Sequence, residues 1–137
     1  MKTCVAYVSH TGNTKRLAEA ISDTLKVPLC DILTAAPSAI ADCDLLFLGT
    51  PVIGGQPAQE MSAFIGKLPH ASGKKAILFC TYAIAKGGTF KTMRKALAEK
   101  GYETVLEVGK RGVKPSKTDF ADILGEIAKT VQKMASG

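Results

Sequence analysis

Apolar and polar residues alternate in blocks along this chain of 137 residues. Five short runs are rich in apolar and β-branched residues, as expected of strands that are buried on both faces. The runs cover residues 3–8, 27–32, 44–48, 75–80 and 104–108. They predict five strands, each followed by a more polar segment.

Most of the segments between these runs carry apolar residues at intervals of three and four, which predicts amphipathic helices. The first covers residues 14–25, and Pro57 is expected to open the second. Phe90, Met93 and Leu97 mark a third, which should end near Gly101. A candidate capping box at 116–119 precedes the fourth. The connection 32–42 contains Pro37 and is expected to hold only one or two turns.

Strands that alternate with helices predict a single α/β domain over residues 1–137, with a parallel sheet and helices on both faces. Ligands of such sheets bind outside the carboxyl ends of the strands. Three loops are expected there, at residues 9–14, 50–56 and 81–89.

The first of these loops reads S-H-T-G-N-T and opens a predicted helix. The first N–H groups of a helix and the positive end of its dipole favour an anion. Three hydroxyl groups and a glycine add donors and backbone freedom. The loop lacks the lysine of a nucleoside triphosphate loop, so a single terminal phosphate fits better. A simple turn that caps the helix remains the alternative.

The composition of the second loop favours a ligand-binding site over a simple turn. It reads G-T-P-V-I-G-G-Q-P and contains no charged side chain. Such an apolar segment is unusual for a solvated loop, but it suits the wall of a site for a flat ring.

The three loops together resemble the cofactor loops of short-chain flavodoxins. The motifs are S-H-T-G-N-T, G-T-P-V-I-G-G-Q-P and F-C-T-Y-A-I-A-K-G-G, each after a predicted strand. The resemblance covers nearly the whole chain. It implies a flavodoxin-like three-layer sandwich with a five-stranded parallel sheet of order 2-1-3-4-5, and FMN as the cofactor.

The resemblance also assigns residues to the parts of FMN. The first loop would hold the phosphate, the second would line the isoalloxazine, and the third would hold the pyrimidine edge and the ribityl chain. No catalytic or metal-binding residue is expected. The expected cofactor-binding residues are Ser9, His10, Thr11, Gly12, Asn13, Thr14, Pro51, Val52, Ile53, Gly54, Gly55, Thr81, Tyr82, Gly87 and Gly88.

Two of these residues have alternative interpretations. The chain has no tryptophan, and Val52 and Ile53 stand where many flavodoxins carry an aromatic ring. Tyr82 is the obvious ring left to stack on the flavin, unless it packs within its loop. His10 either faces the cofactor or is an exposed loop histidine.

The charge of the chain departs from the family, whose members are typically acidic. The formal net charge is +6 and the pI is about 9.2. A field of this sign stabilises an anionic reduced flavin and attracts acidic partners. Lys110, Arg111 and Lys114 form the tightest basic cluster and are candidates for docking a carboxylate-rich protein. A solvated surface is the alternative.

The four cysteines are Cys4, Cys30, Cys43 and Cys80, and they occur singly in or beside apolar runs. Buried, reduced thiols are therefore expected. With no long apolar stretch and no secretory signal, the protein is expected to be cytoplasmic and not to insert into membranes.

The function expected from these features is FMN-dependent electron transfer between redox protein partners, by a monomer or weak dimer. The alternative is an enzyme similar to FMN-dependent NAD(P)H:quinone oxidoreductases, since the missing aromatic ring leaves room for a second ring over the flavin. A flavin-free binding module is a third possibility, which the intact first loop disfavours. Nucleic acid is not an expected partner, because the lysines are dispersed and lack interleaved aromatic residues.

Overall fold

A computed structural model of the chain describes residues 2–112 and 120–136. Five parallel strands form the sheet in the order β2-β1-β3-β5-β6. The short β4 lies off this path, and without it the order is the predicted 2-1-3-4-5, so the predicted topology is confirmed. The strands are β1 (Thr3–Tyr7), β2 (Leu29–Asp31), β3 (Leu45–Ile53), β5 (Lys74–Tyr82) and β6 (Tyr102–Arg111). A short strand, β4 (Gln56–Pro57), pairs antiparallel with the end of β3.

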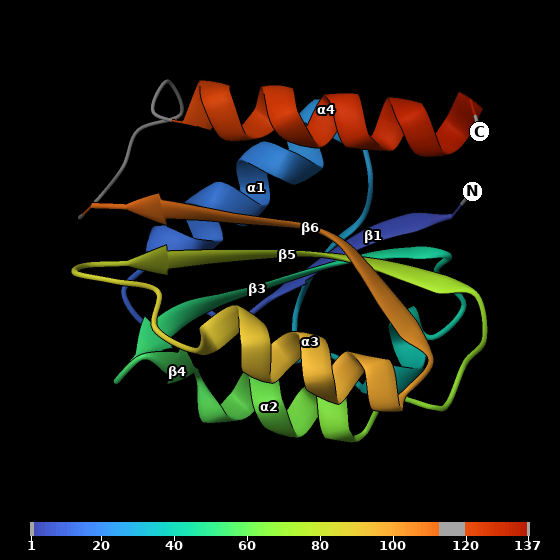
Figure 1. The fold of residues 1–137 in the computed structure, drawn as a ribbon, viewed down its shortest axis with the longest axis horizontal. Coiled ribbons are helices and arrows are strands. Elements are labelled where there is room, and N and C mark those ends of the chain that lie inside the picture. Colours follow the sequence, from blue (N-terminus) through green and yellow to red (C-terminus); the bar gives the residue numbers. More distant parts are fainter. Residues whose placement is uncertain (1, 113–119, 137) are drawn as a thin grey trace.

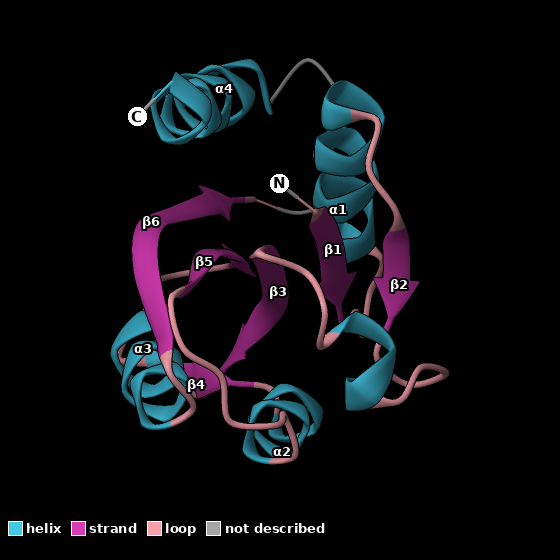
Figure 2. Ribbon diagram, turned by 90° about the vertical axis from the view of Figure 1, so that its right-hand side faces the viewer, coloured by secondary structure: helices cyan, strands magenta, loops and turns pink. Residues whose placement is uncertain are grey.

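Helices cover both faces of this sheet (Figures 1 and 2). On one face lie α1 (Asn13–Leu25) and α4 (Ala121–Ser136), and on the other α2 (Gln59–Gly66) and α3 (Thr89–Glu99). A 3-10 helix, η1 (Pro37–Ile40), forms the only helical turns between β2 and β3, as Pro37 suggested. Each face of the sheet has its own hydrophobic core. The core between the sheet and the helices α1 and α4 contains Phe47 and Phe79, and the core between the sheet and the helices α2 and α3 contains Met61 and Leu78.

The prediction that Pro57 opens a helix is wrong. The strand β3 continues past Leu48 to Ile53, and Pro57 pairs with Val52 in β4. Positive φ angles at Gly54 (59°) and Gly55 (79°) reverse the chain between these two strands. The backbone N–H of Ala58 then donates to Oγ1 of Thr50 at 3.0 Å, and α2 begins one residue later. The predicted capping box at 116–119 and Lys114 lie outside the described residues.

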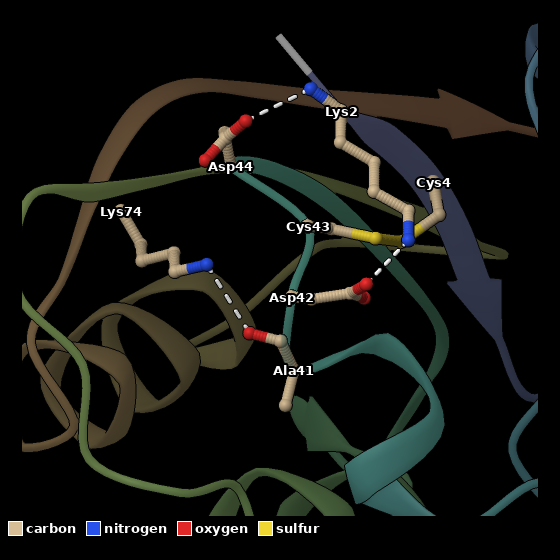
Figure 3. Close-up of polar contacts among 7 residues, drawn as sticks. All are labelled: Lys2, Cys4, Ala41, Asp42, Cys43, Asp44 and Lys74. Atoms are coloured by element: carbon tan, nitrogen blue, oxygen red, sulfur yellow. Dashed lines mark hydrogen bonds and ion pairs between the residues drawn. A yellow bond between two sulfur atoms is a disulfide. The ribbon is translucent and has the colours of Figure 1, made fainter.

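The prediction of reduced thiols is wrong for Cys4 and Cys43, which form a disulfide between the start of β1 and the segment before β3 (Figure 3). Cys30 is free and half-buried, and Cys80 is free and buried. Burial raises the pKa of the Cys80 thiol to about 12, so it stays neutral at ordinary pH. Disulfides are uncommon in reducing compartments outside hyperthermophiles, so this one does not support the expected cytoplasmic location.

No helix in the described parts of the chain is long and apolar enough to cross a membrane.

Candidate functional site

The three loops expected to form a site meet at the carboxyl ends of β1, β3 and β5. In Figure 1 this edge lies on the left, where β5 ends and the chain turns toward α3. A pocket of about 260 Å³ opens between the loops. The expected residues that line it are His10, Thr11, Asn13, Pro51, Val52, Ile53, Thr81 and Tyr82. Among the described residues, Ala83 and Gly112 also line it and were not expected.

The first loop curls at Gly12, whose φ of 94° is a left-handed value that other residues rarely adopt. Its N–H donates to Oγ of Ser9 at 3.0 Å, which closes the turn. Gly12 is also the N-cap of α1 and has no side chain to satisfy the N–H groups of the first helical turn. The loop therefore presents the positive end of α1 beside the exposed side chain of Thr11. This arrangement suits an anion.

Thr14 has a different environment from Thr11. It is 1% exposed, and its Oγ1 lies 2.7 Å from Oγ1 of Thr81, which is also buried. The hydrogen bond joins the first loop to the third. Because each hydroxyl has one hydrogen, the threonine that accepts this bond keeps its own hydrogen to donate elsewhere.

Arg16 is a candidate residue that sequence reasoning missed. Its guanidinium donates to Oδ1 of Asn13 at 2.9 Å, and its Nη1 lies 3.8 Å from the place that a Cβ on Gly12 would take. A positive charge therefore stands beside a loop that contains no lysine or arginine. The signal was available, because residues three apart in a helix share a face.

The second loop forms the apolar side of the pocket. Pro51 and Val52 are half-buried, and Ile53 is 49% exposed. A Cβ on Gly54 would meet nothing within 4 Å, so the backbone at this glycine is open to its surroundings. Ile53 and Gly54 thus leave this side of the pocket accessible.

The third loop packs directly against the second. The N–H of Gly88 donates to the carbonyl oxygen of Gly55 at 2.7 Å. A Cβ on Gly87 would come within 2.6 Å of both Cα and O of Gly55. Neither Gly87 nor Gly88 lines the pocket; they hold its second and third loops together.

Tyr82 lines the pocket and is half-buried. Nζ of Lys86 lies 5.9 Å from the centroid of its ring and the same distance from the ring of Phe90. Contacts of this length are cation–π interactions. The stem of Lys86 passes Gly109, where a Cβ would come within 2.9 Å of its Cδ. Lys86 is therefore held beside Tyr82.

His10 combines the two possibilities that the sequence left open, since it is exposed and also lines the pocket. Its Nε2 lies 2.9 Å from Oε2 of Glu60, in the first turn of α2. The pKa of Glu60 is lowered, first by a hydrogen bond from its own backbone and then by the bond to His10. The contact links the first loop to α2.

Replacing Gly87 by alanine is expected to lower the free energy of unfolding by about 2–5 kcal/mol. The positive φ of 57° costs about 1–2 kcal/mol in a residue with a Cβ, and displacing the Gly55 backbone adds about 1–3 kcal/mol. Gly73→Ala is the matched control, because φ is 73° there and a Cβ would meet nothing. Urea denaturation measures both. Equal losses in the two variants would show that the contact between the loops is unimportant.

The family model described as flavodoxin domain matches residues 4–115. An uncharacterized protein of Methanocaldococcus jannaschii, MJ0298, is 30% identical over 110 residues, which are 78% of this chain and 73% of that protein.

Solved structures share the fold. Oxidised flavodoxin 2 from Bacillus cereus has a TM-score of 0.82 at 22% identity and covers 97% of this chain and 99% of its own. The flavodoxin of Streptococcus pneumoniae TIGR4 has a TM-score of 0.79 at 19% identity, with 98% and 99% covered. Rubredoxin oxygen:oxidoreductase from Desulfovibrio gigas has a TM-score of 0.78 at 16% identity, and the match covers 97% of this chain but 35% of that one.

Proposed function

This chain belongs to the flavodoxin-domain family, and on that premise we propose that it binds FMN at the carboxyl ends of β1, β3 and β5 and transfers electrons between redox partners. One observation carries the proposal: three loops far apart in the sequence line one pocket that is polar on the side of α1 and apolar on the side of β3. FMN has a phosphate at one end and a flat ring system at the other, so its two ends match the two sides. The bound flavin would supply the redox chemistry, and the protein would supply binding and electrostatics.

The phosphate side is proposed to consist of the first turn of α1, the hydroxyl of Thr11 and the guanidinium of Arg16. The helix start and the arginine both favour a dianion. When the hydroxyl of Thr81 donates to Oγ1 of Thr14, the hydroxyl of Thr14 keeps its own hydrogen and would donate it to the phosphate. Ser9 contributes indirectly, because its Oγ accepts from Gly12 and shapes the turn.

The ring side is proposed to consist of Pro51, Val52 and Ile53, with Tyr82 facing the same pocket. These side chains exclude water from a flat ring through apolar contact. Gly54 and Gly55 already adopt positive φ angles, and Gly54 is sterically open, so the peptide between them can turn toward a ring atom at low cost. Gly87 and Gly88 would keep this glycine segment in place rather than contact the cofactor.

The test is reconstitution with FMN followed by anaerobic stepwise reduction, with visible spectra recorded at each step. We expect tight binding and reduction in two resolved one-electron steps, as a carrier between one-electron partners requires. Reduction in a single two-electron step, together with rapid consumption of NAD(P)H in the presence of a quinone and no added reductase, would favour the enzyme. The exposed Ile53 is the feature that keeps this second function open, because it leaves the ring side accessible. Failure to bind FMN would overturn both.

A further inference from the structure

An exposed apolar side chain stands at the edge of the candidate site. Ile84, in the loop between β5 and α3, is 85% exposed, the largest exposed fraction among the big hydrophobic side chains of the described residues. It follows Ala83, which lines the pocket, and Ile53 lines the same pocket at 49% exposure. Exposed apolar residues that gather beside a site point to contact with another molecule.

Three cationic residues lie at this end of the sheet, and contacts of their side chains place two of them, Lys86 and Arg111, close to Ile84. In the pairing of β5 with β6, Lys110 lies opposite Thr81 and Arg111 lies opposite Tyr82. Nε of Arg111 donates to the carbonyl oxygen of Ala83 at 3.2 Å, which fixes the arginine next to Ile84. Lys86 extends from the same loop as Ile84. We call the group formed by Ala83, Ile84, Lys86, Lys110 and Arg111 the Ile84 surface.

The positive charge of the Ile84 surface is not neutralised within the described part of the chain. The carboxylates of β6 are engaged farther back along the strand, where Glu103 pairs with Lys75 at 2.9 Å and Glu107 pairs with Arg94 at 2.6 Å. No carboxylate among the described residues forms an ion pair with Lys86, Lys110 or Arg111. The carboxyl end of β6 is thus left with a net positive charge.

We propose that the Ile84 surface docks an acidic electron-transfer protein, with Ile84 in the apolar centre of the contact and the three cations facing carboxylates of the partner. Protein interfaces combine an apolar centre with a polar rim, and complementary charge speeds encounter and selects partners. Since Ala83 belongs to both the pocket and this surface, a protein docked here would lie beside the proposed flavin site. The inference rests on the proposed function, because it assigns a partner to that site.

The test uses the FMN-loaded chain labelled with ¹⁵N and two probes, a strongly acidic ferredoxin and a basic cytochrome c. We expect the ferredoxin to shift amide signals of residues 82–87 and 109–112, with affinity that falls as salt rises. The cytochrome should leave these signals unchanged. The variant Lys86→Gln/Lys110→Gln/Arg111→Gln should bind ferredoxin about tenfold more weakly at low salt and with a smaller salt dependence.

The matched control is Lys67→Gln/Lys95→Gln/Lys100→Gln, which removes the same amount of positive charge. Lys95 lies within α3, and Lys67 and Lys100 are the C-caps of α2 and α3, at the ends of these helices that are distant from the site. It should change the affinity by less than about threefold. Ile84→Ser should weaken binding without changing the salt dependence. Equal effects of the two triple variants, shifts elsewhere on the surface, no binding of ferredoxin, or equal binding of cytochrome c would overturn the proposal.

The same titration on the flavin-free chain separates the two proposals. One outcome is a chain that does not take up FMN but whose amide signals at the Ile84 surface shift when ferredoxin is added. This outcome would contradict the proposed function and would still support a docking site for acidic proteins. Uptake of FMN with two resolved reduction steps, but no effect of the Lys86, Lys110 and Arg111 changes, would contradict the docking surface alone.

Discussion

Replacing Thr11 and Thr14 together by alanine is expected to raise the dissociation constant for FMN by about 10²- to 10⁴-fold. A hydrogen bond to a charged group contributes about 1.5–3 kcal/mol, and two such bonds to the phosphate would be lost. Thr11 is exposed on the first loop, whereas Thr14 is buried against Thr81. Removing Thr14 also leaves the hydroxyl of Thr81 without this partner. Quenching of FMN fluorescence during titration measures the affinity.

Two comparisons separate loss of the phosphate contacts from damage to the pocket. Riboflavin lacks the phosphate, so its affinity should change far less than that of FMN in the same variant. The variant Thr11→Ser/Thr14→Ser keeps both hydroxyl groups and should stay within about tenfold of the parent chain. An FMN affinity that does not change in the alanine variant would mean that the phosphate binds elsewhere.

The topology of the sheet could be predicted from the sequence because its signal is local. Buried parallel strands such as residues 44–48 are nearly continuous apolar runs, and helices such as 14–25 show their own period. Once strands and helices alternate, the rules for parallel crossovers leave few arrangements. The same rules indicated which edge of the sheet holds the candidate site.

The features that were missed depend on contacts between distant segments. Pro57 has the local character of a helix start, but its pairing with Val52 and the bond from Ala58 to Thr50 delay the helix. The packing of Gly87 against Gly55 of another loop, and the hydrogen bond from the N–H of Gly88 to the carbonyl oxygen of Gly55, were likewise not predicted. Such contacts are set by tertiary packing, which no window of sequence contains.

The disulfide is the clearest example of this limit. Cys4 and Cys43 are 39 residues apart and belong to no recognisable motif. They approach only because β1 pairs with β3, with Cys4 opposite Leu46 and Cys43 just before that strand. Neighbouring contacts hold the same segment: Lys2 pairs with Asp42, its N–H donates to Asp44 at 2.9 Å, and Lys74 donates to the carbonyl oxygen of Ala41 at 3.2 Å (Figure 3).

Reducing this disulfide is expected to lower the free energy of unfolding by about 4 kcal/mol, because the closed loop of about 40 residues no longer restricts the unfolded chain. Urea denaturation with and without a phosphine reductant measures the change, and a thiol count under denaturing conditions should rise from two to four. The variant Cys4→Ala/Cys43→Ala is the control, since the reductant should not alter its stability. FMN affinity in native buffer should stay the same, because the bond lies at the amino ends of the strands, opposite the pocket. An unchanged denaturation midpoint in chains with four titrated thiols would show that the bond adds no stability, and a loss of FMN affinity would show that the two ends of the sheet are coupled.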